Sequence, residues 1–472
     1  MIAWVVAAPL LAAIVTTAFP DLRTRRLVRI FLAAVAAVLP LSVAGSIGWL
    51  SLTFIVIVSI LSFLATVFSI GTFSPEWGGS ETIWSRKSVY FVLLGAFWSA
   101  MLLVVLAQNF AALWLGISAT TLATAFLVGF SGEAAALEAA WKYLVLCSVG
   151  IGFALLGIVV LAHVTIAGGI DSRLALSWTA IVGHGFGAPP PAARLATVLM
   201  LIGFATKAGL VPMHAWLPDA HSKAPAPISA LLSGVLVSCA LYAIVRTLEV
   251  GSALGASWLL HEILVWLGAA STIVAGALML AQRDLKRMLA YSTVEHAGIV
   301  ALALGFGGSL GFLAALLHII GHAFAKSAAF FAAGMLQNDL GTTTLAKLRG
   351  LWKRGGSGRF LLAALIALAG MPPFGLFVSE LLLVFAGVAA HQWVPLGLGL
   401  IGIVLGFAAI SRNAIEIESG TSAVPRIAGR LPTVARGTIA VALTGALIVA
   451  VVPWTALGAS LQGIAVAMDT AP

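Results

Sequence analysis

Charged side chains are scarce in this sequence. Only 9% of its 472 residues are Asp, Glu, Lys or Arg, whereas ordinary soluble domains contain about 25%. Hydrophobic residues make up 61% of the chain, and the mean hydropathy is +1.11. This composition excludes a soluble globular domain and indicates an all-α polytopic membrane protein.

Cysteine is almost absent as well. Cys147 and Cys239 both lie in apolar runs, where we expect packed thiols and neither a disulfide nor a metal pair. The sequence has no cysteine set for an iron–sulfur cluster, no glycine-rich phosphate loop and no histidine pairs suited to haem. We therefore expect no cofactor, no metal and no catalytic or redox centre in this chain.

Long apolar runs dominate what is present. Since about 20 apolar residues cross a hydrocarbon core, the sequence predicts about fourteen spans. They run at approximately 2–19, 30–48, 51–72, 88–106, 109–129, 139–163, 193–216, 226–248, 256–280, 288–306, 309–336, 358–387, 393–414 and 436–456. The first run has no basic residues before it and no small-residue cleavage site, so we interpret it as a span and not as a signal peptide. Spans seven, eleven and twelve are long or interrupted, and each is expected to contain a break.

Basic residues are distributed unevenly between the loops. Most of the 25 Lys and Arg residues fall in alternate loops that begin with the first, whereas the other loops hold only Arg173, Arg194 and Arg246. The positive-inside rule then predicts a cytoplasmic (inner) membrane protein, bacterial or archaeal, with both termini outside. The net charge of +9 is therefore interpreted as a topology signal, and we expect a lipid bilayer and no nucleic acid as a partner.

Lys207 stands within a predicted span, five residues before Pro212. An ammonium in hydrocarbon costs several kcal/mol, so such a lysine usually faces a polar interior. Pro212 breaks the helical hydrogen-bond ladder, and broken spans are tolerated only inside protein or along a wet cavity. A lysine that snorkels to the interface is the alternative; the adjacent break favours a buried, proton-exchanging group. The polar bend that follows, with His214 and His221, is either a hydrogen-bonded turn cluster or a cytoplasmic mouth.

Span eleven carries His318, His322 and Lys326 at intervals of four residues, so the three side chains share one helix face. A proton relay is favoured, because histidine exchanges protons near pH 7. One alternative is a structural polar stripe. Another is a two-histidine metal site, which no acidic or third ligand accompanies in the sequence.

Three further ionisable residues lie in apolar surroundings. Glu295 and His296 follow a charged segment at 283–287 that is interpreted as cytoplasmic anchors, and they predict either a proton entrance or an interfacial salt-bridge network. Glu380 comes seven residues after Pro373 in span twelve. A carboxylate there must be paired or protonated, which suits a terminal proton acceptor on the outer side.

Spans seven and twelve show an internal symmetry. Each combines a proline break with one ionisable residue, and five spans of separation make them run in opposite directions. This pattern predicts two inverted five-helix repeats. The expected domains are an N-terminal three-helix segment at 1–87, repeats at 88–248 and 249–416, and a last helix with its tail at 417–472.

Four long motifs carry a family resemblance: TKAGLVPMHAWLPDAHSKAPAPISALLSG, DLKRMLAYSTVEHAGIVALALG, HIIGHAFAKSAAFFAAGML and AGMPPFGLFVSE. They resemble the antiporter-like membrane subunits of respiratory complex I and of Mrp-type cation/proton antiporters. Within that superfamily, LEAAWKYLVLCSVGI, SGVLVSCALYAIVR and STVEHAG resemble hydrogenase-4 component F, a subunit of group 4 membrane-bound hydrogenases and formate hydrogenlyase-like complexes. The resemblance implies inverted repeats with broken helices seven and twelve, Lys207 as the central lysine and Glu380 as the outlet. It also implies partnership with other membrane subunits and with a peripheral redox arm.

One departure from the family pattern bears on function. The family usually places a glutamate in span five opposite the span-seven lysine, and the matching position here is Ser118. Glu133 and Glu138 lie at the cytoplasmic end of span six, too far to substitute. The first hypothesis is a proton- or cation-translocating subunit of a redox-driven complex. The alternatives are a non-pumping scaffold subunit, a membrane partner in an inorganic-carbon uptake complex and, least favoured, a standalone antiporter.

Overall fold

A computed structural model describes residues 1–19, 22–72, 85–186, 191–351, 356–419 and 433–452. These residues are predominantly helical and form no sheet. The helices are α1 (Ile2–Thr17), α2 (Leu22–Val38), η1 (Leu39–Ser46), α3 (Trp49–Thr72), α4 (Arg86–Leu106), α5 (Phe110–Val128), α6 (Ala134–Ala167), α7 (Trp178–His184), α8 (Pro191–Ala208), α9 (Trp216–Lys223), α10 (Ala226–Leu231), η4 (Leu232–Leu236), α11 (Val237–Ala253), α12 (Ser257–Leu280), α13 (Leu285–Phe306), α14 (Gly308–Leu340), α16 (Ser357–Leu368), α17 (Gly375–Ala389), α18 (Trp393–Glu418) and α19 (Thr433–Ile448).

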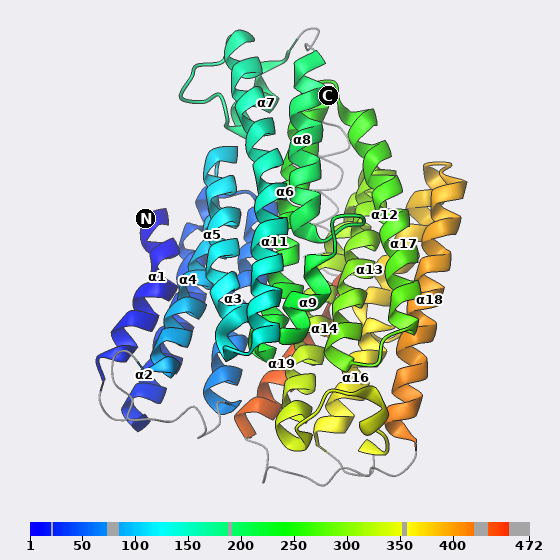
Figure 1. Cartoon of the computed structure of the whole chain (residues 1–472). Helices are drawn as coiled ribbons and strands as arrows, with labels where there is room; N and C mark the ends of the chain where they lie inside the picture. The colour runs from blue at the N-terminus through cyan, green and yellow to red at the C-terminus, as the bar shows by residue number, and fades with distance from the viewer. Residues whose placement is uncertain (20–21, 73–84, 187–190, 352–355, 420–432, 453–472) are drawn as a thin grey trace.

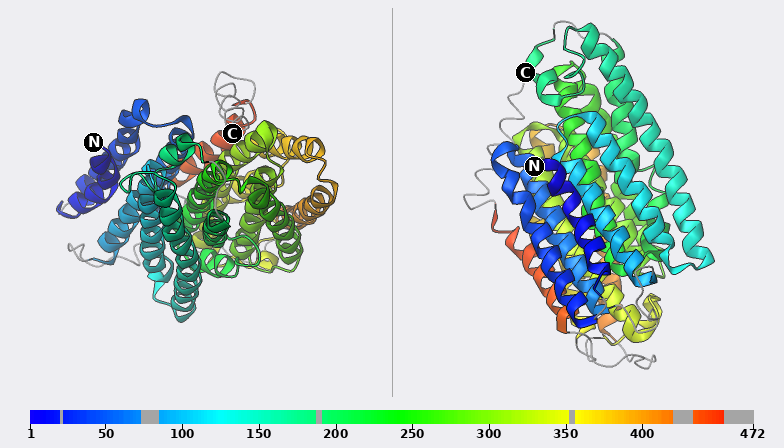
Figure 2. Two further views of the ribbon diagram at one scale, coloured as in Figure 1. Left: turned by 90° about the horizontal axis from the view of Figure 1, so that it is seen from above. Right: turned by 90° about the vertical axis from the view of Figure 1, so that its left-hand side faces the viewer.

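Eleven helical segments in the described ranges are long and apolar enough to cross a membrane, and α1, α16, α17 and α19 are shorter apolar helices. Every predicted span overlaps one of these helices or an interrupted series of them; the count of fourteen stays a prediction. The expected tail after residue 452 and parts of the basic loops at 352–355 and 420–432 lie outside the described residues. Figure 1 shows the bundle with α1 and α2 at one edge and α18 at the opposite edge, and the view from above in Figure 2 repeats this order.

The breaks expected in spans seven and twelve are confirmed. Helix α8 ends at Ala208 and α9 begins at Trp216, and between them Gly209 adopts φ +77°, a conformation that a side chain disfavours. Helix α16 ends at Leu368 and α17 begins at Gly375, with Gly370 at φ +63° between them. Prolines follow both glycines and cannot supply the amide that would continue the helix.

The break expected in span eleven is wrong. Helix α14 is continuous over its 33 residues, which corresponds to about 50 Å at 1.5 Å per residue. It contains no proline, and its glycines serve packing: a Cβ at Gly321 would touch Leu376 of α17, and one at Gly334 would overlap Ala226 of α10. The excess length of this span therefore extends the helix instead of interrupting it.

Small residues bring the helices close together, as is usual in membranes. A Cβ at Gly203 of α8 would lie 2.6 Å from backbone atoms of Ala154 and Gly150 in α6, and one at Gly268 of α12 would lie 2.7 Å from the Gly298 carbonyl of α13. The most enclosed helices are central. In an apolar stretch of 18 residues taken from each helix, 100% of the residues are buried in α10–α11 and 94% in α13, against 39% in α6 and in α18. Polar groups on the central helices thus face protein.

Two local features were not predicted. The π-helical segment η4 separates α10 from α11, and its Ser233 hydroxyl bonds that of Thr293 in α13 at 2.6 Å. Helix α7 forms within the loop expected at 164–192. The two cysteines are free and buried, as expected.

Candidate functional site

Lys207 lies in the last turn of α8 with only 1% of its surface exposed, so the snorkelling alternative is wrong. Its ammonium donates to the Thr121 hydroxyl at 2.8 Å and to the Tyr143 hydroxyl at 2.6 Å. The rings of Tyr143 and Trp216 lie 4.7 and 5.9 Å from Nζ, close enough for cation–π attraction. We call Thr121 and Tyr143 the hydroxyl cage of Lys207.

No carboxylate completes this cage among the described residues. Ser118, at the position where the family pattern has an acid, donates to the Trp114 carbonyl at 2.8 Å. Thr121, three residues further along the same helix face, contacts the lysine instead. Glu138 lies outside the cage, as expected, because it pairs with Lys142 at 2.7 Å, where both side chains are exposed.

The polar bend after Pro212 is divided between surface and core. His214 stays half-buried and bonds none of the other predicted site residues in the part of the chain that the structure describes. His221 in α9 is fully buried, with its ring 6.2 Å from Trp216 and 5.8 Å from Phe330 of α14. Trp216 and His221 therefore lie between Lys207 and helix α14. Trp216 also donates to the Thr206 carbonyl at 2.9 Å, and this carbonyl accepts the Gly209 amide at 3.2 Å as well.

Lys326 is fully buried in the middle of the bundle. Its ammonium donates to the Leu289 carbonyl of α13 at 2.7 Å and also to the Ser292 hydroxyl. The second lysine of the bundle is thus bound by neutral oxygens of α13, in the same manner as Lys207 is bound by hydroxyls.

Three histidines meet between α13 and α14. Nδ1 of His296 lies 2.9 Å from Nε2 of His318, and the ring of His322 lies 5.0 Å from that of His296. Nδ1 of His318 lies 2.9 Å from the hydroxyl of Ser379 in α17. The shared face predicted for His318, His322 and Lys326 thus points at α13, and His296 joins it from that helix.

The two carboxylates approach this cluster from different sides. Glu295 is 3% exposed, and it packs against Gly406 of α18, where a Cβ would overlap its carboxylate. It forms no ion pair within the described residues, so the interfacial salt-bridge alternative is wrong. The Glu380 carboxylate packs against Gly370 in the α16–α17 break. One of its oxygens lies within 4.8 Å of ring nitrogens of His296 and His318.

Lys286 corrects the expectation of surface anchors at 283–287. It is 2% exposed, and its ammonium donates to the Ala224 carbonyl at 2.6 Å. Arg287, by contrast, is half exposed and lies 3.4 Å from Asp219. The reason is the helical period: Lys286 faces Ala224, between α9 and α10, whereas the next residue faces outward.

A polar cavity of about 700 Å³ opens beside Lys286. Its wall includes charged residues from three segments and the end of the bend: Arg86, Glu133, Lys223, Asp284, Lys286 and Arg287. This is the end of the bundle at which the basic loops were predicted. The bend therefore does line an opening, although Lys223 and Ser222 form its wall and the two bend histidines do not.

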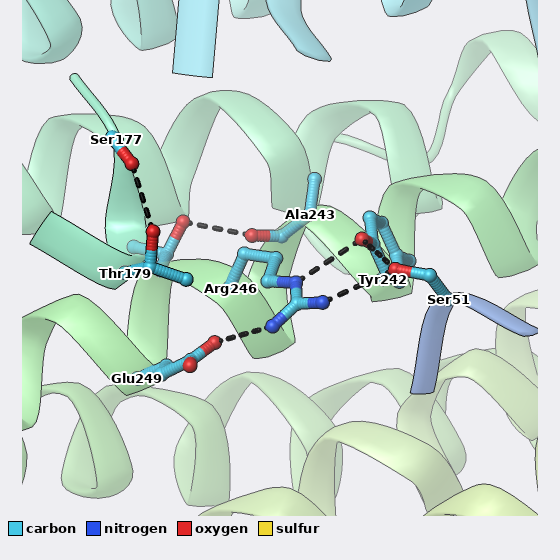
Figure 3. A network of polar contacts seen from close by, with 8 residues as sticks. Ser51, Ser177, Thr179, Tyr242, Ala243, Arg246 and Glu249 are labelled. Carbon is cyan, nitrogen blue, oxygen red and sulfur yellow. Dashed lines mark hydrogen bonds and ion pairs between the residues drawn. The ribbon is translucent and has the colours of Figure 1, made fainter. Parts of the chain in front are cut away.

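Arg246 is a buried arginine that the loop assignment placed on the outer side. It is 9% exposed within α11, and it bonds Tyr242 at 3.1 Å, Ser51 of α3 at 3.2 Å and Glu249 at 2.7 Å. Figure 3 shows its guanidinium at the centre of these contacts. The ring of Trp178 in α7 lies 4.8 Å away. Arg246 of α11 thus contacts α3 and α7. It lies about 30 Å from the cavity, measured along α10–α11.

Sequence reasoning missed Thr121, Tyr143, Ser292 and Ser379. All four are buried hydroxyl residues that contact a predicted ionisable group. No sequence signal singled them out: even tyrosine, with four residues in the chain, lies in a predicted span every time.

The sequence is similar to those of known membrane proteins. Residues 107–406 match the family described as NADH:quinone oxidoreductase/Mrp antiporter, transmembrane. The chain is 34% identical over 384 residues to the hydrogenase-4 component F homolog of Methylacidiphilum infernorum, covering 79% of this chain and 78% of that protein.

Two solved structures have similar backbones. A chain of the membrane-bound sulfane sulfur reductase, an archaeal respiratory membrane complex, matches with a TM-score of 0.84 at 23% identity, over 98% of this chain and 97% of that one. A chain of respiratory complex I from Thermus thermophilus matches with a TM-score of 0.77 at 22% identity, over 98% and 100%. These matches confirm the all-helical membrane fold.

Proposed function

The chain belongs to the NADH:quinone oxidoreductase/Mrp antiporter transmembrane family, and from this we propose that it is a proton- or cation-translocating membrane subunit of a redox-driven complex like hydrogenase-4 or complex I. One observation carries the proposal. Ionisable side chains, all buried except the half-buried Glu380, follow one another through the bundle: Lys207, His221, Lys326, His322, His318, His296 and Glu380. Such groups are costly inside a membrane and mark ion pathways.

The proposed route begins at the cavity of about 700 Å³, where Lys286 is the first buried group. His221 links the region of Lys207 to that of Lys326. Its neighbour Trp216 lies beside Lys207, and its other neighbour, Phe330, lies one helical turn from Lys326. From Lys326 the route continues through the three histidines to Glu380 at the α16–α17 break. Glu295 stands beside this route, next to His296 in the sequence.

The hydroxyl cage allows Lys207 to act without a carboxylate. A hydroxyl accepts a hydrogen bond from an ammonium, and it donates one to a neutral amine. Thr121 and Tyr143, at 2.8 and 2.6 Å, therefore can hold the side chain in both protonation states. A carboxylate would stabilise the protonated lysine more strongly than a hydroxyl does. The serine at position 118 removes that extra stabilisation, but it does not by itself exclude proton exchange by Lys207.

A scaffold subunit that translocates no ions is the second candidate, and the missing acid at position 118 is the observation that favours it. The test uses the purified complex in liposomes, with protons counted against electrons during turnover. Lys207→Met and Glu380→Gln are expected to abolish proton uptake and leave assembly intact. Lys142→Met is the matched control, since its side chain is 47% exposed. An unchanged proton-to-electron ratio in both variants would refute translocation and favour the scaffold.

The partners that we propose are further membrane subunits and a peripheral redox arm, with no cofactor in this chain. Both termini are proposed to lie outside. Mass spectrometry of the proteins that co-purify in mild detergent tests the assembly. Redox subunits support it, whereas a zinc-containing partner without redox subunits would support inorganic-carbon uptake instead. Activity of a reporter fused to the C-terminus, in the periplasm or in the cytoplasm, decides the orientation.

A further inference from the structure

Three potential metal ligands converge from three helices. A ring nitrogen of His296 in α13, one of His318 in α14 and a carboxylate oxygen of Glu380 in α17 lie within 4.8 Å of one another. We propose that these residues form a binding site for a transition-metal ion of the Zn²⁺ class. The sequence offered His318 and His322 without a third ligand; the fold instead brings His296 and Glu380 to His318.

The ligand set fits the chemistry of that ion. Zinc binds imidazole nitrogen and carboxylate oxygen at about 2.0–2.2 Å, and sites with two histidines and one glutamate leave a fourth position open. Tetrahedral ligands at that distance are about 3.3 Å apart. Nδ1 of His296 and Nε2 of His318 are 2.9 Å apart. The carboxylate of Glu380 needs to approach by about 1.5 Å at most, which rotation of its side chain can supply.

His318 is already oriented for coordination. The Ser379 hydroxyl donates to the Leu376 carbonyl at 2.8 Å, so towards His318 it acts as the acceptor at 2.9 Å. The ring proton of neutral His318 then sits on Nδ1, and Nε2 directs a lone pair towards His296. Such hydrogen bonds from outside the ligand set fix the ring and its tautomer in metal sites.

The surroundings favour an additional positive charge. Glu295 stands next to the proposed ligand His296 in α13. One oxygen of Glu295 is buried without a hydrogen-bond partner in the described structure, and a buried carboxylate is costly unless it is paired. An ion can approach from the α16–α17 break, because Glu380 is only half-buried and Met371 in the break is 40% exposed.

A bound ion would occupy the groups that carry protons to the outlet, so it would act as an inhibitor of translocation. This consequence rests on the proposed function, whereas binding itself does not. The first experiment therefore measures binding alone. The purified complex is treated with a chelator, incubated with Zn²⁺, passed through a desalting column and analysed for zinc per subunit; Co²⁺ serves as a second probe through its visible absorption.

The wild type is expected to retain one more Zn²⁺ than His318→Gln or Glu380→Gln. His322→Gln is the matched control, a buried histidine one turn along the same helix, and it is expected to retain the ion. Ser379→Ala keeps all three ligands and is expected to weaken binding 10- to 100-fold. Equal zinc in the wild type and His318→Gln, or equal loss in His322→Gln, would overturn the site.

Inhibition is measured separately. Zn²⁺ is expected to lower the proton-to-electron ratio of the wild type and to leave that of Ser379→Ala unchanged at the same concentration. Bound zinc without inhibition would retain the site and remove its regulatory consequence. Inhibition of equal strength in both proteins would assign the effect to another site.

Discussion

Replacing Tyr143 with phenylalanine removes one oxygen from the hydroxyl cage and leaves the aromatic ring in place. The ring contacts to Lys207 at 4.7 Å and to Trp216 at 5.0 Å remain, so the change isolates the 2.6 Å hydrogen bond. A hydrogen bond to a charged group contributes about 1.5–3 kcal/mol. The protonated form of Lys207 is expected to lose that stabilisation.

Since 1.4 kcal/mol corresponds to a factor of ten, this loss lowers the ratio of protonated to neutral Lys207 about 10- to 150-fold. If this lysine carries protons, proton uptake per electron in reconstituted liposomes falls with it, while redox turnover measured without a membrane gradient is retained. Thr121→Val, which removes the 2.8 Å bond at similar volume, is expected to have a similar effect.

Tyr90→Phe is the matched control. Tyr90 is a second fully buried tyrosine, and its hydroxyl bonds Ser69 at 3.0 Å in the α3–α4 pair. Its removal is expected to leave the proton-to-electron ratio unchanged. Equal ratios in wild type, Tyr143→Phe and Thr121→Val would refute the role of the cage, and a loss in Tyr90→Phe of the same size would assign the effect to general destabilisation.

Three further predictions address packing and topology. Arg246→Met is expected to destabilise the protein by about 1.5–3 kcal/mol through loss of its charged hydrogen bonds, seen as a lower melting temperature in detergent. Arg194→Met, at an exposed position, should not lower it, and equal melting of both variants would contradict a stabilising role of the Arg246 hydrogen bonds. Gly203→Ala is expected to cost about 1–3 kcal/mol, because a Cβ would overlap the α6 backbone, whereas Gly152→Ala meets nothing within 4 Å; the same melting assay compares them, and equal values would argue against close α6–α8 packing. Ser222→Cys in the wall of the cavity is expected to react with a membrane-impermeant maleimide added from the cytoplasmic side and not from outside. Ser59→Cys, at a buried position, is the unreactive control, and labelling only from outside would show that the proposed topology is inverted.

Local chemistry made part of this structure predictable. Apolar length identified the helices, and Pro212 and Pro373 identified the two breaks, since proline acts on its own backbone. Burial of Lys207 followed from its place in an apolar run beside Pro212. The expected break in α14 failed because length alone was taken as a signal where no residue interrupts the ladder.

The site itself depends on contacts that no local pattern contains. His296 and His318 are 22 residues apart and meet only because α13 and α14 pack face to face. Lys207 reaches Thr121 and not Ser118, a difference of one helical turn that family position could not resolve. Lys286 resembled its exposed neighbours in type, and only its hydrogen bond to the Ala224 carbonyl, between α9 and α10, shows that it points inward.

The uninterrupted helix α14 has a mechanical consequence. Lys326 and His318 stand eight residues apart on it, about 12 Å along one stiff rod. The rod contacts Ala226 of α10 through Gly334 and Leu376 of α17 through Gly321. With no hinge between these points, a displacement that loosens Lys326 from Leu289 and Ser292 also changes the distances from His318 to His296 and Ser379. Proton transfer at Lys326 and proton transfer at His318 would therefore be coupled through one motion of a single rigid helix.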